Sequence, residues 1–238
     1  MDYYDFLGTL HKALQPRTYV EIGVQTGDAL KLADCASIGV DPAFILRVDV
    51  KGTKPLCLLF EETSDSFFAR HDPTALLGGP VELAFLDGMH QFEFLLRDFI
   101  NMERHCRPDS LILLHDCLPP HFSMTSRKQA SSRWNPAPFQ GWWTGDVWKI
   151  VPVLRQYRPE LSIDLLDCLP TGLAIVTGLD PQNQVLSHAY EEIVARNARR
   201  WTDRLRFHRY WASVETASSD LSAEQLQARY PLRPTTTP

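Results

Sequence analysis

The stretch Thr18-Tyr-Val-Glu-Ile-Gly-Val-Gln-Thr-Gly27 decides the fold of this chain. A short run rich in β-branched and aromatic residues leads through an acidic residue to two glycines, and a helix-compatible stretch follows at about residues 27–35. The order predicts a strand, a tight glycine turn and a helix, which together form the first unit of a nucleotide-binding α/β fold.

The spacing of the two glycines narrows the class of ligand. A dinucleotide fingerprint requires G-x-G-x-x-G, in which the middle glycine lets the backbone approach a pyrophosphate. Here the pattern is Glu21-x-Gly23-x-x-x-Gly27, with valine and glutamine in the middle. This favours a ligand without a pyrophosphate, and the anionic Glu21 favours a cationic one. The spacing of the glycines therefore argues against an NAD-dependent oxidoreductase.

A second acidic residue follows at the expected distance. The apolar stretch 37–41 ends in Asp41, about 20 residues after the first strand, where nucleotide-binding α/β folds place the acceptor for ribose hydroxyls. The alternative is an ordinary turn, because Asp41 precedes a proline. Because Asp41 follows the glycine pattern at the expected spacing, we favour the ribose role.

Apolar and helical stretches alternate along most of the chain. Strands are expected near 18–23, 37–41, 54–60, 81–87, 110–115, 161–166 and 172–177, and helices near 2–14, 27–35, 64–71, 90–105 and 146–157. This predicts an α/β fold with a doubly wound, Rossmann-like, mostly parallel sheet of seven strands.

Three parts of the chain have separate expected roles. Residues 1–180 are expected to form the cofactor-binding domain. Within it, residues 117–145 combine prolines with three tryptophans and no clear period, which predicts a lid or substrate loop. Residues 181–238 are expected to form a helical extension with a frayed tail from about Pro231, and its aromatic residues to pack on the domain or on a second copy of the chain.

Composition excludes several classes of protein. The net charge of −5 gives no electrostatic footprint for nucleic acid. No apolar run approaches the ~20 residues of a membrane span, and the N-terminus lacks the features of a signal peptide. Five scattered cysteines indicate reduced thiols, so we expect a cytoplasmic protein that binds neither nucleic acid nor membranes.

Two further strands end in groups that carry chemistry. Residues 81–87 lead into Asp87-Gly-Met-His90, and residues 110–115 lead into His115-Asp116-Cys117. Ligands of open parallel sheets lie beyond the carboxyl ends of the strands. Both clusters are therefore expected on the same rim as Glu21, Gly23 and Asp41.

The segments Phe85-Leu-Asp-Gly-Met-His-Gln-Phe-Glu93, Arg107-Pro108 and Leu113-Leu-His-Asp-Cys117 resemble those of class I S-adenosylmethionine (SAM) methyltransferases, in particular methyltransferase family 24. The resemblance covers about residues 17–178. Phe92 stands where the family has tyrosine, and the glycines that usually follow Arg107-Pro108 are missing.

The resemblance implies SAM as the cofactor and a role for each matching residue. Glu21 would lie near the methionine amine, Gly23 and Gly27 would form the turn, Asp41 would bind the ribose, and Ser64-Asp65 would lie near the adenine. Asp87 would also border the cofactor.

Related sugar and catechol-type O-methyltransferases imply a divalent cation such as Mg²⁺. The positions that match their carboxylate ligands are Asp87 and Asp116. Beside Asp116 this chain offers only His115 and Cys117 as a third ligand, and cysteine is a poor ligand for Mg²⁺. The metal is therefore left open.

The resemblance also implies a general base, His90, three residues after Asp87. A neutral imidazole suits this role near pH 7. The alternative is a structural histidine that caps the next helix or bonds Asp87. Asp87 is the second catalytic candidate: without a metal, Asp87 and Asp116 would orient the acceptor hydroxyl and His90 directly. His115, by contrast, is expected to point into the core.

These observations predict a SAM-dependent O-methyltransferase acting on a small hydroxylated acceptor such as a sugar or glycan intermediate. The alternative from another class is a catalytically silent, methyltransferase-like binding or scaffold module. The C-terminal helices are a candidate surface for a homo-oligomer.

Overall fold

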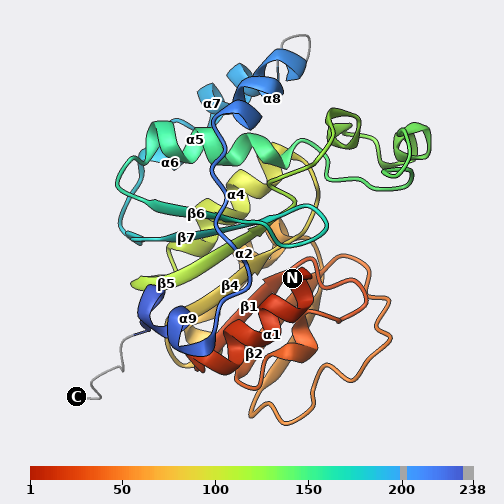
Figure 1. The fold of residues 1–238 in the computed structure, drawn as a ribbon. Helices are drawn as coiled ribbons and strands as arrows, with labels where there is room; N and C mark the ends of the chain where they lie inside the picture. Colours follow the sequence, from red (N-terminus) through yellow and green to blue (C-terminus); the bar gives the residue numbers. More distant parts are fainter. Residues whose placement is uncertain (199–202, 233–238) are drawn as a thin grey trace.

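The fold is built on one seven-stranded sheet with helices on both faces (Figure 1). The computed structural model describes residues 1–198 and 203–232. The strands are β1 (Thr18–Ile22), β2 (Ala36–Asp41), β3 (Cys57–Glu61), β4 (Val81–Leu86), β5 (Cys106–His115), β6 (Ser162–Leu166) and β7 (Leu173–Thr177). Their order in the sheet is β3-β2-β1-β4-β5-β7-β6.

Most of the sheet is parallel. The neighbouring pairs from β3 through β5 are all parallel, whereas β7 runs antiparallel to both β5 and β6. The predicted doubly wound, mostly parallel sheet is therefore confirmed, with β7 as its reversed strand.

Two groups of helices cover the two faces. The helices are α1 (Tyr3–Leu14), α2 (Ser64–Arg70), α3 (Pro73–Leu77), α4 (Phe92–Glu103), α5 (Ile150–Tyr157), α6 (Val185–His188), α7 (Tyr190–Asn197), α8 (Asp203–Ala212) and α9 (Ala223–Arg229). Helices α1 and α9 pack together on one face, and the large apolar core beneath α4 and α5 lies on the other.

Side chains alternate between these two cores along each central strand, as the pleat requires. In β1, Val20 and Ile22 enter the core beneath α4, whereas Tyr19 enters the core beneath α1. Glu21 shares the face of Tyr19 because it lies two residues further along the strand. A carboxyl group is thereby placed inside the protein.

One predicted helix is wrong. Residues 27–35 contain only a single 3-10 turn, η1 (Leu30–Leu32). The connection from β1 to β2 begins with the glycine turn and ends where β2 begins at Ala36, so too few residues remain between them for an α-helix. The short helix α3 was not predicted, although Asp72 caps it and Pro73 begins it, which is a readable start signal.

The C-terminal helices pack on the domain. Phe207 and Tyr210 of α8 contact Trp148, with ring centroids 5.5 Å apart in both pairs, and the Tyr210 hydroxyl donates to the carbonyl of Cys117. The expected frayed tail falls largely on residues 233–238, outside the described residues. In the part of the chain that is described, no helix is long and apolar enough to cross a membrane. All five cysteines are free.

Candidate active site at the strand ends

The carboxyl ends of β1, β2 and β4 meet at one place. The amide of Gly23 donates to the carbonyl of Val40 at 2.9 Å, and the amide of Asp87 donates to the carbonyl of Ile22 at 2.8 Å. Because β5 pairs in parallel with β4, Asp116 follows on the same rim. The structure thus brings together the strand-end residues that the sequence placed at a common edge.

Glu21 is buried behind this rim rather than exposed on it. Its side chain is 1% accessible and accepts a hydrogen bond of 2.7 Å from the Tyr19 hydroxyl. Burial raises the pKa of Glu21 to about 8, with the charge of Asp87 adding to the effect. Glu21 is therefore mostly protonated at neutral pH until a cation approaches it.

Gly23 is required by the protein itself. It has φ +90°, and a Cβ there would lie 2.2 Å from the carbonyl oxygen of Asp87. The turn role expected for this glycine is therefore accompanied by a close approach to the backbone of Asp87 and Gly88, just after β4. A Cβ on Gly27 would likewise meet Val50, 2.5 Å away, in the loop that follows β2.

Asp41 organises the loops at the end of β2. Its two carboxylate oxygens accept hydrogen bonds from the amides of Gln25 and Ala43, each at 2.8 Å. The residue ties the glycine turn to the loop after β2, so its turn role is realised. The ribose role remains a prediction, because each oxygen keeps further acceptor capacity.

Ser64 and Asp65 begin α2. Asp65 forms a two-pronged ion pair with Arg97 of α4, at 2.6 and 2.8 Å. Ser64 lies beside Asp98, a carboxyl group of α4 that is 2% accessible. Burial raises the pKa of Asp98 to about 7, and its Oδ1 has no partner among the described residues. An unsatisfied buried acceptor of this kind indicates a place for a ligand donor.

Asp87, His90 and Asp116 form a compact cluster. Nδ1 of His90 lies 2.8 Å from Asp116 Oδ2, and Nε2 lies 3.5 Å from Asp87 Oδ1. One donor atom from each of the three residues lies within 4.8 Å of the others. The imidazole is thus held between two carboxylates that come from different strands.

A second histidine, His115, contacts Asp87 of the cluster from the end of strand β5. Nδ1 of His115 lies 3.0 Å from Asp87 Oδ1, and the ring packs against Tyr3 of α1, with centroids 4.2 Å apart. His115 is 8% accessible, so it is buried as expected, yet it faces the candidate site. Tyr3 was missed by the sequence analysis, because nothing in the N-terminal helix pattern shows that it reaches the rim.

The electrostatics of the cluster follow from these contacts. Burial alone lowers the pKa of both histidines, but the carboxylates outweigh it. Asp116, with help from Asp87, raises the pKa of His90 above its ordinary value. Asp87 and Asp116 raise the pKa of His115 to about 9. Burial opposes ionisation of Asp116, but the two histidines prevail and lower its pKa.

The backbone at Asp116 is strained in the manner of functional sites. Its φ is +61°, a left-handed conformation that non-glycine residues rarely adopt. The Thr171 hydroxyl donates to Asp116 Oδ1 and fixes the carboxylate. The next residue, Cys117, turns into the apolar core and is fully buried. Cys117 therefore lies outside the cluster formed by Asp87, His90 and Asp116.

The donor set fits a divalent cation. Two carboxylates and one imidazole would supply three protein ligands, with His90 in the place where the sequence offered only His115 or Cys117. Carboxylate oxygens suit Mg²⁺ or Mn²⁺, and an added imidazole shifts the preference towards Mn²⁺, Fe²⁺ or Zn²⁺. A metal held in this way would occupy His90, so the residue could not then be the base.

The loop 117–145 reaches directly over the cluster. The indole of Trp143 stacks on His90 with centroids 4.7 Å apart and planes at 8°. A Cβ on Gly145 would lie 1.6 Å from the carbonyl oxygen of His90, so the two backbones are in close contact. Three tryptophans in this stretch predicted packing against something, and for Trp143 the partner is the candidate base.

Two cavities differ in size and position. About 10 Å³ remains open between the cluster, Asp98 and Val147, which is too small for a nucleoside. A cavity of about 370 Å³ lies between the loop 117–145 and α8, and its lining includes Phe122, Arg204 and Trp211. The small space at the cluster is bordered by Val147, which follows the loop 117–145 in the chain.

Comparison with known proteins bears on the family and the fold. Residues 20–117 match the family 24 model described as "Methyltransferase domain", which confirms the predicted resemblance to class I SAM methyltransferases. No curated protein matches the chain by sequence.

Solved structures share the fold. The S-adenosylhomocysteine (SAH)-bound methyltransferase PaMTH1 of Podospora anserina is 12% identical, with a TM-score of 0.54 over 75% of this chain and 78% of that one. The O-methyltransferase TomG of Streptomyces achromogenes, in complex with SAM, is 13% identical, with a TM-score of 0.53 over 75% and 80% of the two chains. At these identities the likeness establishes the fold alone.

Proposed function

We propose that this chain, whose residues 20–117 match a methyltransferase domain model, transfers a methyl group from SAM to a hydroxyl oxygen of a small acceptor. The observation that carries the proposal is the cluster of Asp87, His90 and Asp116 at the rim, beside the glycine turn. It places an imidazole and two carboxylates where the ligand of this fold class binds.

The residues present fit the cofactor. Glu21 would meet its ammonium group, Asp41 its ribose hydroxyls, and the free acceptor on Asp98 supports an amino-group donor near Ser64. SAM supplies a methyl group already activated on a sulfonium. The protein therefore has to bind, orient and deprotonate the acceptor.

His90 is the proposed base. Asp116 Oδ2 lies 2.8 Å from Nδ1 and would orient the ring, which leaves Nε2 to accept the proton of the acceptor hydroxyl. The acceptor oxygen loses its proton to Nε2 and forms the new O–CH₃ bond as the sulfonium S–CH₃ bond breaks. Asp87, 3.5 Å from Nε2, supports an imidazolium once it forms.

The metal version has its own support in the same three residues. A cation bound by Asp87, His90 and Asp116 would lower the pKa of the acceptor hydroxyl directly. In that version His90 is a ligand, and deprotonation needs no imidazole base.

The acceptor is proposed to be a hydroxylated ring compound such as a sugar or glycan intermediate. This part of the proposal rests on the resemblance to sugar and catechol-type O-methyltransferases. The cavity of about 370 Å³ shares no lining residue with the cluster of Asp87, His90 and Asp116, so it carries no argument about the acceptor.

Cofactor binding and turnover test the proposal. Calorimetry with SAH should show binding, and tritiated SAM should transfer label to members of a panel of sugars, sugar nucleotides and catechols. His90→Ala should lower kcat by about 10²–10⁴ with little change in SAH affinity. Full activity of this variant would exclude both roles of His90.

EDTA separates the two versions. In the metal version EDTA abolishes turnover, Mn²⁺ or Mg²⁺ restores it, and Asp87→Asn loses both metal and activity. In the base version EDTA changes nothing. Failure of SAH and SAM to bind at all would favour the scaffold module instead.

A further inference from the structure

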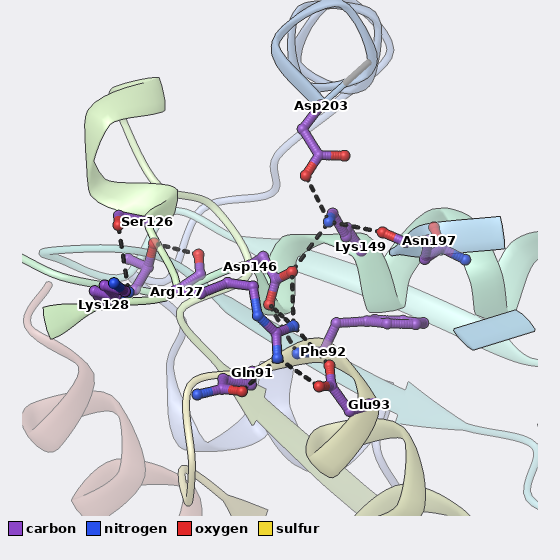
Figure 2. Close-up of polar contacts among 12 residues, drawn as sticks. Gln91, Phe92, Glu93, Ser126, Arg127, Lys128, Asp146, Lys149, Asn197 and Asp203 are labelled. Atoms are coloured by element: carbon purple, nitrogen blue, oxygen red, sulfur yellow. Dashed lines mark hydrogen bonds and ion pairs between the residues drawn. The ribbon is translucent and has the colours of Figure 1, made fainter. Parts of the chain in front are cut away.

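A chain of alternating charges joins the loop 117–145 to the segment that carries His90 (Figure 2). Arg127 lies at its centre and comes from the loop. Its guanidinium donates to Glu93 Oε2 at 2.7 Å and to the two carboxylate oxygens of Asp146 at 3.2 and 3.3 Å. It also donates to the side-chain carbonyl of Gln91.

Every partner of Arg127 flanks His90 in sequence or space. Gln91 follows His90 directly, and Glu93 lies in the first turn of α4. Asp146 Oδ1 accepts a 2.9 Å hydrogen bond from the amide of Phe92. This bond caps the start of α4, since Gln91 at the cap position makes no capping bond with its own side chain.

The network continues to the C-terminal helices. The ammonium group of Lys149, 1% accessible, lies 3.0 Å from Asp146 and 2.7 Å from Asp203 of α8, and donates to the carbonyl of Asn197 (Figure 2). The side chain of Asp146 is 5% accessible and has cations on both sides. Removal of Arg127 would leave this buried carboxylate with Lys149 and the amide of Phe92 as its remaining partners.

The same loop reaches the imidazole itself. Trp143 stacks on His90, and the indole N–H of Trp143 donates to the carbonyl of Ser126, the residue before Arg127. Arg127 and Trp143 are thus joined through one peptide unit. The ring that covers His90 is therefore anchored on the residue next to Arg127.

We propose that Arg127 is a positioning residue for His90: by binding Glu93 and Asp146 it holds the loop 117–145 closed and keeps Trp143 stacked on the imidazole. The inference rests on the proposed role of His90. It adds that the site is competent only while this ion-pair latch is formed, so opening of the loop for ligand entry has to break it.

The fork of Arg127 explains why a lysine would not replace it. Arginine presents several donors in one plane and reaches three acceptors together, whereas lysine is a single charged point. Arg127→Lys should therefore keep part of the function, and Arg127→Met should lose it. Arg133→Met is the matched control, since Arg133 is an exposed arginine of the same loop that stacks on Trp134.

The first readouts need neither acceptor nor turnover. In nuclear magnetic resonance spectra the His90 ring protons should be shifted by the stacked indole, and Arg127→Met should move them to the position seen in Trp143→Leu. Chymotrypsin should cut the loop at least about tenfold faster in Arg127→Met, because cleavage follows the open population. Millimolar guanidinium should slow that cleavage in Arg127→Ala.

The last measurement is the rate of methyl transfer by the Arg127 variant. Arg127→Met should lower kcat by about 10–100-fold, the effect of a misplaced catalytic group, with SAH affinity unchanged. Should Arg127→Met fail to fold, Glu93→Gln provides the same comparison. Wild-type protein that binds no SAH would refute the proposed function, whereas unchanged His90 signals and unchanged cleavage in both variants would overturn the latch.

Discussion

Replacement of Glu21 by glutamine tests whether a buried carboxyl group at the end of β1 weakens the fold. Glu21 is 1% accessible, and its side chain accepts hydrogen bonds from the Tyr19 hydroxyl and from the backbone of Leu30. Glutamine has nearly the same shape and can still accept the bond from Tyr19 through its carbonyl oxygen. The variant therefore removes the ionisation of the side chain and leaves its packing in place.

The magnitude follows from the pKa. In the folded protein the pKa of Glu21 is about 8, against 4.5 in the unfolded chain. Because the folded value is raised, the proton stabilises the native state fully below pH 4.5, and this contribution is lost as the pH rises towards 8. At about 1.4 kcal/mol per tenfold difference in proton affinity, the free energy of unfolding at pH 7 falls by roughly 3 kcal/mol.

Urea unfolding from pH 4.5 to 8 measures the effect. We expect Glu21→Gln to show a flatter profile than wild type and to be the more stable protein at pH 7. The same variant should bind SAH more weakly, since it cannot offer an anion to the ammonium group. The exposed Glu191→Gln should follow wild type throughout. Parallel stability profiles for Glu21→Gln and wild type would refute the assignment of a raised pKa.

Three further predictions concern the turn and the other face of the sheet. In urea unfolding, Gly23→Ala should lower the free energy of unfolding by roughly 2–4 kcal/mol, because the positive φ strains alanine and the new Cβ overlaps with Asp87. Gly52 is the control: it also has a positive φ but has open space around it, so Gly52→Ala should cost only about 1–2 kcal/mol of backbone strain. Asp41→Ala should weaken SAH binding in calorimetry by roughly 1–3 kcal/mol, and unaltered affinity would exclude its ribose role. Burial and nearby Lys54 lower the pKa of His11 to about 4. Neutral His11 therefore stabilises the fold above pH 6.5, and the free energy of unfolding should fall by about 3 kcal/mol as the pH drops to 4. Acid unfolding of His11→Leu should lack this loss, and an equal loss in the variant would contradict the prediction.

The sequence by itself determined the sheet and its rim. Each strand has an apolar run with a readable end, and the acidic groups Glu21, Asp41, Asp87 and Asp116 stand at strand ends in the printed order. Parallel pairing then brings those ends together without further information. The short crossover after Gly27 escaped prediction, because local propensity does not register how little chain remains before β2.

Only the tertiary structure decided how the site is completed. His90 and Asp116 belong to different strand ends, and their contact depends on the register of β4 and β5. Arg127 and Tyr3 reach the site from a loop and from an N-terminal helix, where no local pattern marks them. Their roles arise because the fold brings distant segments together. The Tyr3 and His115 rings lie 4.2 Å apart and Arg127 lies 2.7 Å from Glu93, and such contacts between residues far apart in the chain are a property of packing that sequence periodicity does not contain.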